Sequence, residues 1–429
     1  MLVYVLWLFM VMGFLLPKIK ILFFSFGVED LVGLAVLPYA LTGITSTEKN
    51  TWIPLKWYAF VGIVIIISGI LLGIFNSVLF LNKLVVPTEM FQYVKRLSIF
   101  LLTAKIIRNY GFEGRQLLRP FLLMLMMTLL IGVLQLFDNP FSSFISRIYI
   151  SEELQLEALQ DATFKDTRNY SITGFSTSWG GLSLFIMVVG IAFFVYTRAK
   201  GRLIRGYRLW FFLLMAALGL INVIFSGSRG ALLGLAGVLI FVLIYNFIKT
   251  QTVAGKIRFI SYFVVFLLIS AVLVYVFFLE RILFIQYRNE ALLQAYDQGG
   301  NRFGDIYKIM DALQNPFWLI FGMSNAVQRA IYVPYGVEVE PVYLIANYGL
   351  VGIALRYGWL LMIFSKANQI FVYADKFDFS LAKAVGYGAM LGIVGYLTFS
   401  VGYFFFQETV AGCIPWIFFG IVAGIRVKE

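Results

Sequence analysis

The stretch PLKWYAFVGIVIIISGILLGIFNSVLFL, residues 54–81, contains a single charged side chain, Lys56. A helix of about 20 mostly apolar residues is long enough to cross the hydrocarbon core of a bilayer. A surface helix of a soluble protein would instead carry polar residues along one face. We therefore predict that residues 54–81 form a transmembrane helix.

Similar apolar stretches occur along the whole chain, and the least apolar of them contains Lys95 and Arg96. The predicted membrane helices cover residues 2–16, 20–42, 54–81, 90–108, 116–137, 176–197, 207–226, 229–248, 257–279, 341–364, 382–405 and 408–426. We therefore expect an all-α, polytopic membrane protein with about 12 transmembrane helices. Residues 1–429 are expected to form one integral membrane domain.

The composition also favours a membrane protein. Hydrophobic residues make up 61% of the chain and charged residues 13%, whereas about 25% of residues are charged in typical soluble domains. The net charge of +12 is typical of the Lys and Arg bias of cytoplasmic loops, and we expect no nucleic-acid partner. The sequence has no histidine and one cysteine, Cys413, so the commonest general base and metal ligand is missing.

The basic residues predict the orientation, because Lys and Arg are retained on the cytoplasmic side of a membrane. They gather after the predicted helices 90–108, 176–197 and 229–248. All three connections are cytoplasmic if both termini are cytoplasmic, and Lys18 and Lys20 then lie on the opposite side. We predict a multi-pass protein with this orientation.

The same orientation makes two long connections external, residues 138–175 and 280–340, and these contain most of the acidic residues. Long loops without repeats are usually functional, so we predict a working site on the external face. Within the second loop, the segment DIYKIMDAL, residues 305–313, favours a short amphipathic helix on the membrane surface. Its apolar positions at helical spacing are Ile306, Ile309, Met310 and Leu313.

The segment SGSRGALLGL, residues 226–235, places Ser228, Arg229 and Gly230 at the external start of a predicted helix. A helix N-terminus favours an anion, and an arginine beside it adds charge and a bidentate fork for phosphate. Arg229 is therefore a candidate anion-binding residue. An arginine that only anchors the helix by snorkelling fits the same pattern.

Two further segments bring arginines to the external loops. The segment RNYSITGFSTSWGG, residues 168–181, contains Arg168 and Gly174 among several hydroxyl groups, and such a loop can place backbone N–H groups near a sugar or phosphate. The segment NRFGDIYKIMDALQNPFWLIFG, residues 301–322, places Arg302 at the start of the amphipathic helix. Ser/Gly-rich loops are common, and Arg302 fits a solvated surface charge equally well.

The segment EVEPVYLIANYGLVG, residues 338–352, sets Glu338 and Glu340 at the outer end of a predicted helix. Without histidine, a carboxylate is the favoured general base for activating a sugar hydroxyl. Two carboxylates at this spacing equally fit a divalent cation site or a solvated acidic rim. The spacing does not choose among these three interpretations.

Together, the four segments resemble the O-antigen polymerase and O-antigen ligase superfamily of bacterial envelope glycosyltransferases, over the whole chain. The matching residues are Arg168 and Gly174 in an Arg and Gly-rich segment, Ser228, Arg229 and Gly230 in an S-R-G helix start, Arg302 at the start of a loop helix, and Tyr348, Gly349 and Gly352 in a Y-G-x-x-G motif. The ligase branch has a histidine at the position of Glu338. The carboxylates of Glu338 and Glu340 therefore favour the polymerases of the Wzy type.

This resemblance implies a GT-C-like fold in the bacterial cytoplasmic (inner) membrane, with its active site facing the periplasm or exterior. The implied reaction is the polymerisation of oligosaccharide repeat units into a cell-surface polysaccharide such as the O-antigen of lipopolysaccharide. Donor and acceptor are both undecaprenyl-pyrophosphate-linked glycans, and neither a cofactor nor a metal is required. Membrane lipid, a chain-length regulator and a flippase are the other implied partners.

Residue roles follow from this reaction. A leaving pyrophosphate gains negative charge, and arginines would stabilise that charge. The acceptor hydroxyl would lose its proton to Glu338 or Glu340, and direct displacement would invert the anomeric configuration. The predicted pyrophosphate-binding residues are Arg168, Arg229 and Arg302, and the predicted substrate-loop residues are Gly174, Ser228 and Tyr348.

Three other functions fit the sequence less well. A ligase would transfer finished polymer to a lipid or protein acceptor. A transporter or lipid flippase would be expected to show internal repeats and ionisable residues at the membrane midplane, where Glu29, Asp30 and Arg356 are the candidates. A membrane scaffold would leave the Arg and Gly motifs unexplained.

Overall fold

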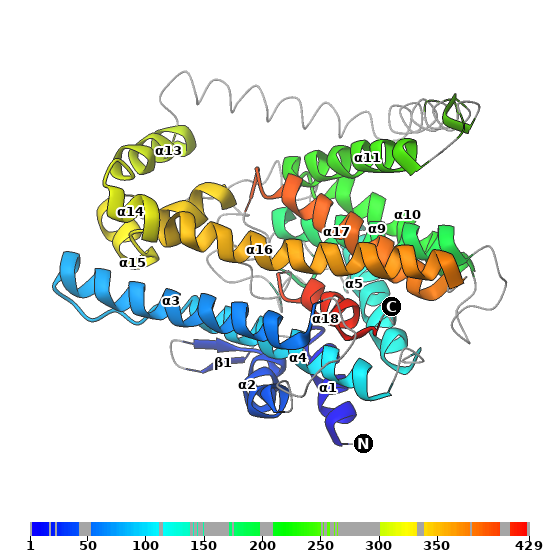
Figure 1. Cartoon of the computed structure of the whole chain (residues 1–429), viewed down its shortest axis with the longest axis horizontal. Coiled ribbons are helices and arrows are strands. Elements are labelled where there is room, and N and C mark those ends of the chain that lie inside the picture. The colour runs from blue at the N-terminus through cyan, green and yellow to red at the C-terminus, as the bar shows by residue number, and fades with distance from the viewer. Residues whose placement is uncertain are drawn as a thin grey trace.

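Figure 1 shows the computed structural model of the chain. The described residues are 2–16, 19–21, 24–42, 53–110, 115–137, 171–173, 176–197, 209–249, 301–332, 339–377, 380–403 and 412–426, with short pieces within 140–149 and 252–264. Most of the predicted helix 257–279 lies outside them, as do Arg168, Gly174 and Glu338.

The described chain is helical apart from one short hairpin. The helices are α1 Leu2–Gly13, α2 Val28–Leu41, α3 Leu55–Leu81, α4 Met90–Tyr110, α5 Arg115–Leu134, α9 Ser176–Thr197, α10 Leu209–Phe225, α11 Arg229–Lys249, α13 Asn301–Ala312, α14 Pro316–Phe321, α15 Asn325–Val327, η2 Gln328–Tyr332, α16 Glu340–Phe377, α17 Ser380–Phe399 and α18 Ile414–Gly424. Strands β1 Ile19–Ile21 and β2 Phe24–Phe26 pair antiparallel. The prediction of an all-α protein is therefore confirmed for the fold class.

The hairpin corrects the predicted helix 20–42, which begins only at Val28. The Asp30 carboxylate accepts a hydrogen bond of 2.7 Å from the Gly27 N–H. This bond satisfies a backbone donor at the helix start, so it fixes the first turn of α2 at this position. Hydropathy alone did not reveal this boundary, because the strands before it are as apolar as a helix.

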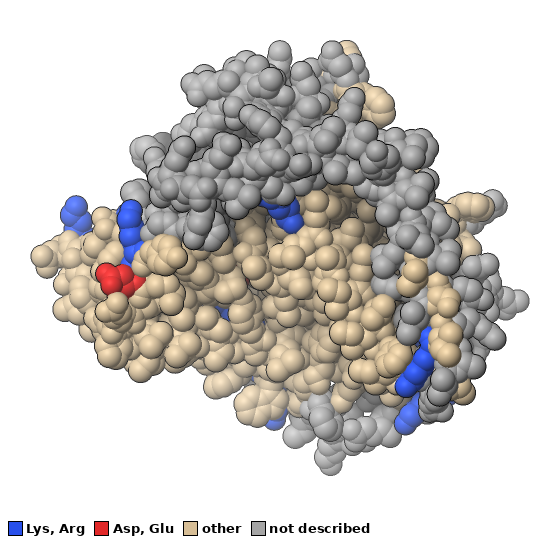
Figure 2. Space-filling view, turned by 90° about the horizontal axis from the view of Figure 1, so that it is seen from above, with Lys and Arg blue, Asp and Glu red and all other residues tan. Residues whose placement is uncertain are grey.

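The long helices indicate a membrane-embedded protein. Six helices of the described chain are long and apolar enough to cross a bilayer: Leu55–Leu81, Leu117–Leu134, Ser176–Tyr196, Arg229–Lys249, Glu340–Ala374 and Leu381–Phe399. Large apolar side chains on these and neighbouring helices are exposed, including Leu71, Trp210 and Leu361. Figure 2 shows uncharged residues over most of the described surface on one face. An exposed apolar surface of this extent favours contact with lipid.

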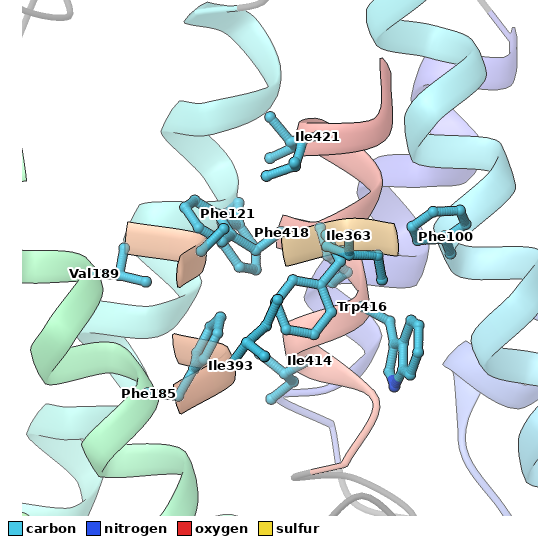
Figure 3. Packing of buried hydrophobic residues seen from close by; sticks show 14 of the residues in the cluster. Phe100, Phe121, Phe185, Val189, Ile363, Ile393, Ile414, Trp416, Phe418 and Ile421 are labelled. Carbon is cyan, nitrogen blue, oxygen red and sulfur yellow. The ribbon is translucent and has the colours of Figure 1, made fainter. Parts of the chain in front are cut away.

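The core surrounds α18, whose residues are all buried. Figure 3 shows Ile414, Trp416 and Phe418 of this helix among side chains from the helices around it. The Phe418 ring lies 6.1 Å from Phe121 of α5, and the Trp416 ring lies 4.4 Å from Trp359 of α16. Aromatic contacts at these distances hold α18 as the central element of the bundle.

The amphipathic helix predicted at 305–313 is present as α13, but part of its apolar face packs against the protein. Ile309 and Leu313 are buried in a small cluster with Trp318, Met323 and Ala346. Met310, which was predicted to share this face, is 55% exposed. Figure 1 shows α13, α14 and α15 gathered at one end of the bundle, beside the end of α3.

Helix α16 contains a sharp break at Gly349, where φ is 63° and ψ is −169°. A Cβ added to Gly349 would lie 2.2 Å from the Ile320 carbonyl oxygen of α14. The break therefore depends on a residue with no side chain, because the neighbouring atom belongs to the backbone and φ is positive. It turns the segment Glu340–Tyr348 away from the long straight part of the helix.

Gly349→Ala is expected to lower the thermal unfolding temperature, since a strained φ alone costs about 1–3 kcal/mol. The matched control is Gly358→Ala in the same helix, where an added Cβ meets no atom within 4 Å. This control is expected to keep or raise the unfolding temperature. Thermal unfolding in detergent measures both, and equal behaviour of the two variants would contradict the structural role of Gly349.

Candidate functional site

The Ser-Arg-Gly turn, residues 226–230, begins α11 as the sequence predicted. The Ser228 hydroxyl accepts a hydrogen bond of 3.3 Å from the Ala231 N–H and so caps the helix. Gly227 has a φ of 61°, and the Ser226 hydroxyl accepts from the Ser228 N–H at 3.3 Å. These bonds fix the turn, so the half-buried Arg229 is the first residue of a helix N-terminus that favours an anion.

The turn packs between the start of α9 and the end of α17. A Cβ on Gly180 would lie 2.6 Å from the Ser226 hydroxyl oxygen, and a Cβ on Gly402 would lie 3.2 Å from the Gly230 Cα. Both glycines therefore permit a close approach of backbone to the turn. These contacts fix the position of Arg229 relative to α9 and α17.

Glu340 reaches the same end of α17. Its N–H donates a hydrogen bond of 3.1 Å to the Ser400 carbonyl, and its side chain is hydrogen-bonded to Tyr396. Glu340 is buried, with 2% of its surface exposed. Residues Phe399–Gly402 thus contact the start of α11 on one side and the start of α16 on the other, and this brings the segments of Arg229 and Glu340 together.

A buried arginine, Arg356, lies beyond the break in α16. Its Nε donates a hydrogen bond of 2.7 Å to the Tyr93 hydroxyl of α4. Its guanidinium carbon lies 3.6 Å from the centre of the Tyr348 ring and 4.6 Å from that of Tyr93. The guanidinium is held between two aromatic faces, an arrangement that stabilises a desolvated cation. Its Nη1 donates to the Gly352 carbonyl at 3.4 Å. Among the described residues its Nη2 has no hydrogen-bond partner, so this nitrogen can still donate to an anionic oxygen.

Tyr348, a predicted substrate-loop residue, is buried against Arg356 in the structure. Its ring centre lies 6.3 Å from that of Tyr343, the next aromatic side chain towards the start of α16. Tyr348 therefore orients the arginine and faces the interior of the cluster. We call Tyr93, Tyr343, Tyr348 and Arg356 the tyrosine–arginine cluster.

Glu89, between α3 and α4, is a second carboxylate beside this cluster. It is partly buried, is hydrogen-bonded to Asn325, and lies within electrostatic reach of Arg329 and Arg356. Burial raises the pKa of Glu89, and the two arginines, the Asn325 bond and a bond to its own backbone oppose this rise without cancelling it. The sequence offered no signal for Glu89, because it belongs to no motif and meets its partners only through the fold.

The raised pKa of Glu89 predicts a dependence of stability on pH. The folded protein keeps the proton to a higher pH than the unfolded chain does, so the free energy of unfolding falls as the pH rises from the ordinary pKa of 4.5 towards the raised value. Above the raised pKa, the contribution of Glu89 to the free energy of unfolding no longer changes with pH. Glu89→Gln removes the decline, so its unfolding temperature relative to the natural protein is expected to increase over this interval. Identical pH profiles in thermal unfolding would contradict the assignment.

No protein-family model and no curated protein matches the chain. The side chains at this end of the bundle therefore carry the functional interpretation. Of the predicted site residues, Ser228, Arg229, Glu340 and Tyr348 are described at this end, and Arg302 is described only through the backbone of α13. Arg168, Gly174 and Glu338 stay predictions. No group of three His, Cys, Asp or Glu side chains suited to a metal occurs in the described part of the chain.

The buried charges Glu29 and Asp30 have a structural role. Lys95 of α4 lies 2.5 Å from the Asp30 carboxylate and 3.9 Å from that of Glu29. Asp30 also caps α2 through Gly27. These carboxylates neutralise a lysine that is fully buried, so a stable pair between α2 and α4 explains them without transport.

Proposed function

We propose that the protein is a glycosyltransferase that polymerises undecaprenyl-pyrophosphate-linked oligosaccharide repeat units into a bacterial cell-surface polysaccharide. It works in the cytoplasmic (inner) membrane, with about 12 transmembrane helices in a GT-C-like arrangement. Both termini are cytoplasmic, and the site that contains Arg229 and Glu340 opens to the external face. Glu338, Arg168 and Arg302 belong to the same site in this proposal.

One observation carries the proposal. The start of α11, with Arg229, and the start of α16, with Glu340, both contact Phe399–Gly402 at the end of α17. A cation at a helix N-terminus and a buried carboxylate thus share one end of an apolar bundle. Transfer from a pyrophosphate donor to a hydroxyl acceptor needs both groups, because negative charge develops on the leaving group while a proton leaves the nucleophile.

The proposed step is a direct displacement at the anomeric carbon of the donor. The acceptor hydroxyl oxygen forms the new glycosidic bond, and the bond from the anomeric carbon to the pyrophosphate oxygen breaks. The hydroxyl proton passes to the carboxylate of Glu340 or Glu338, and undecaprenyl pyrophosphate leaves with the bonding electrons. Arg229 stabilises the departing charge, and the aromatic faces of the tyrosine–arginine cluster keep Arg356 available for the same anion.

The distribution of basic residues supports the proposed orientation. The Lys249 and Lys383 ammonium groups lie 4.1 Å and 5.3 Å from the Phe371 ring centre, which joins the end of α11, the far part of α16 and the start of α17. Arg108 at the end of α4 is close to Arg426 after α18. This basic end is opposite to the site along α11 and α16, as expected if it faces the cytoplasm.

The decisive test is a reaction of purified protein with its lipid-linked repeat unit in the presence of a chelator. A ladder of lipid-linked products with increasing numbers of repeat units is the expected result. Polymer transferred to a lipid core or protein, without extension on the carrier, would identify a ligase instead. Movement of the lipid-linked unit across a vesicle bilayer without a new glycosidic bond would overturn the enzyme proposal in favour of a flippase.

A further inference from the structure

Lys366 is a buried cation in the part of α16 that lies beyond the break. Only 1% of its surface is exposed, although α16 is one of the membrane-length helices. Within the described side chains, Lys366 makes no ion pair with a carboxylate; the two ion pairs found there both belong to Lys95. A buried ammonium without a counter-charge is unfavourable, and an anion bound beside it would stabilise the charged form of Lys366.

The charged groups around Lys366 increase the cost of its positive charge. The Arg108 guanidinium at the end of α4 lies close enough to repel the Lys366 ammonium. Arg426, which follows α18, repels Arg108 in the same way. Gly424 at the end of α18 packs against Ala104 and Ile107 of α4, so Arg426 follows α18 beside Arg108. Arg108 thus has a positive charge on either side at the basic end, and charge–charge repulsion grows as water is excluded. An anion bound between them would remove both costs at once.

We propose that Lys366, Arg108 and Arg426 bind the phosphate of an anionic phospholipid at the basic end of the bundle. The location of these three residues favours a lipid headgroup, since Arg426 is exposed at the end of a bundle whose surface is apolar. Basic pockets between helices bind anionic headgroups, and the cytoplasmic leaflet is rich in them. Arginine supplies a bidentate fork for phosphate, and a lysine supplies a compact charge. The proposal does not depend on the enzymatic function, because the site is remote from Arg229 and Glu340.

The test compares lipid binding by purified, delipidated protein in detergent. Native mass spectrometry and thermal unfolding are measured with phosphatidylglycerol, phosphatidylcholine or inorganic phosphate. The natural protein is expected to prefer phosphatidylglycerol, and Lys366→Met is expected to weaken its binding about tenfold, as for the loss of one charge-assisted hydrogen bond. Lys366→Arg keeps the charge and is expected to retain the preference.

Two variants separate a local site from a general charge effect. Lys376→Met removes an exposed lysine of the same helix and is expected to leave lipid binding unchanged. Arg108→Gln removes the second cation and is expected to weaken binding even if Lys366→Met does not fold. The proposal is overturned if Lys366→Met and Arg108→Gln both bind phosphatidylglycerol like the natural protein. It is also overturned if Lys376→Met weakens lipid binding as much as Lys366→Met does, or if inorganic phosphate alone gives the full thermal shift.

Discussion

Glu340→Gln is expected to reduce the formation of lipid-linked polymer by at least about 10²-fold, the range that a positioned general base contributes. Glutamine has the same shape and can accept the hydrogen bond from Tyr396, and the bond from the Glu340 N–H to Ser400 is unaffected. The variant should therefore fold and insert normally. The length of the lipid-linked product in the purified reaction measures the effect.

The matched control for Glu340→Gln is Asp311→Asn on α13, an exposed carboxylate that accepts a hydrogen bond of 2.9 Å from Gln314. It removes one negative charge near the same end of the bundle and is expected to leave the ladder unchanged. Glu338→Gln completes the comparison, since only one of the two neighbouring carboxylates can be the base. A normal ladder of products from both glutamine variants would exclude Glu338 and Glu340 as the general base. Glu89 would then be the next carboxylate to test for this role.

The helices could be predicted from the sequence because each is marked by a continuous apolar stretch of its own. Residues 54–81 and 229–248 are mostly apolar, and α3 and α11 follow them closely. The failures occur where another element decides the outcome. Ile19–Ile21 and Phe24–Phe26 pair with each other as strands. Met310 is exposed because α13 meets the small cluster around Trp318 with only part of its apolar face.

The candidate site was predicted in part for the same reason. Ser228 and Arg229 form a recognisable helix start within a few residues, and the capping bond to Ala231 confirms that start. Arg356 was noticed only as a charge inside a predicted membrane helix, and its place between Tyr93 and Tyr348 depends on the break at Gly349. Contacts between residues hundreds of positions apart leave no local pattern.

Arg229→Gln is expected to lower the rate of polymer formation by about 10²–10³-fold, as for the removal of one group that stabilises developing charge. The backbone of the turn is held by Ser226 and Ser228, so the change removes the charge and leaves the helix start in place. Lys249→Gln, at the other end of α11, removes an equal charge 20 positions away along the same helix and is expected to keep full activity. Initial rates with the lipid-linked donor measure both variants.

The same pair of variants decides between the two interpretations of Arg229. If Arg229 only anchored α11 by snorkelling, its loss would act on insertion and thermal stability, and Lys249→Gln would act in a similar way. If Arg229 stabilises the leaving pyrophosphate, Arg229→Gln lowers the rate while the unfolding temperature stays within a few degrees of the natural protein. Arg229→Lys should then recover part of the rate, because an ammonium retains the charge without the bidentate fork. A normal rate in Arg229→Gln would show that the leaving pyrophosphate is not stabilised at the start of α11. Arg356 would then be the remaining described candidate for stabilising it.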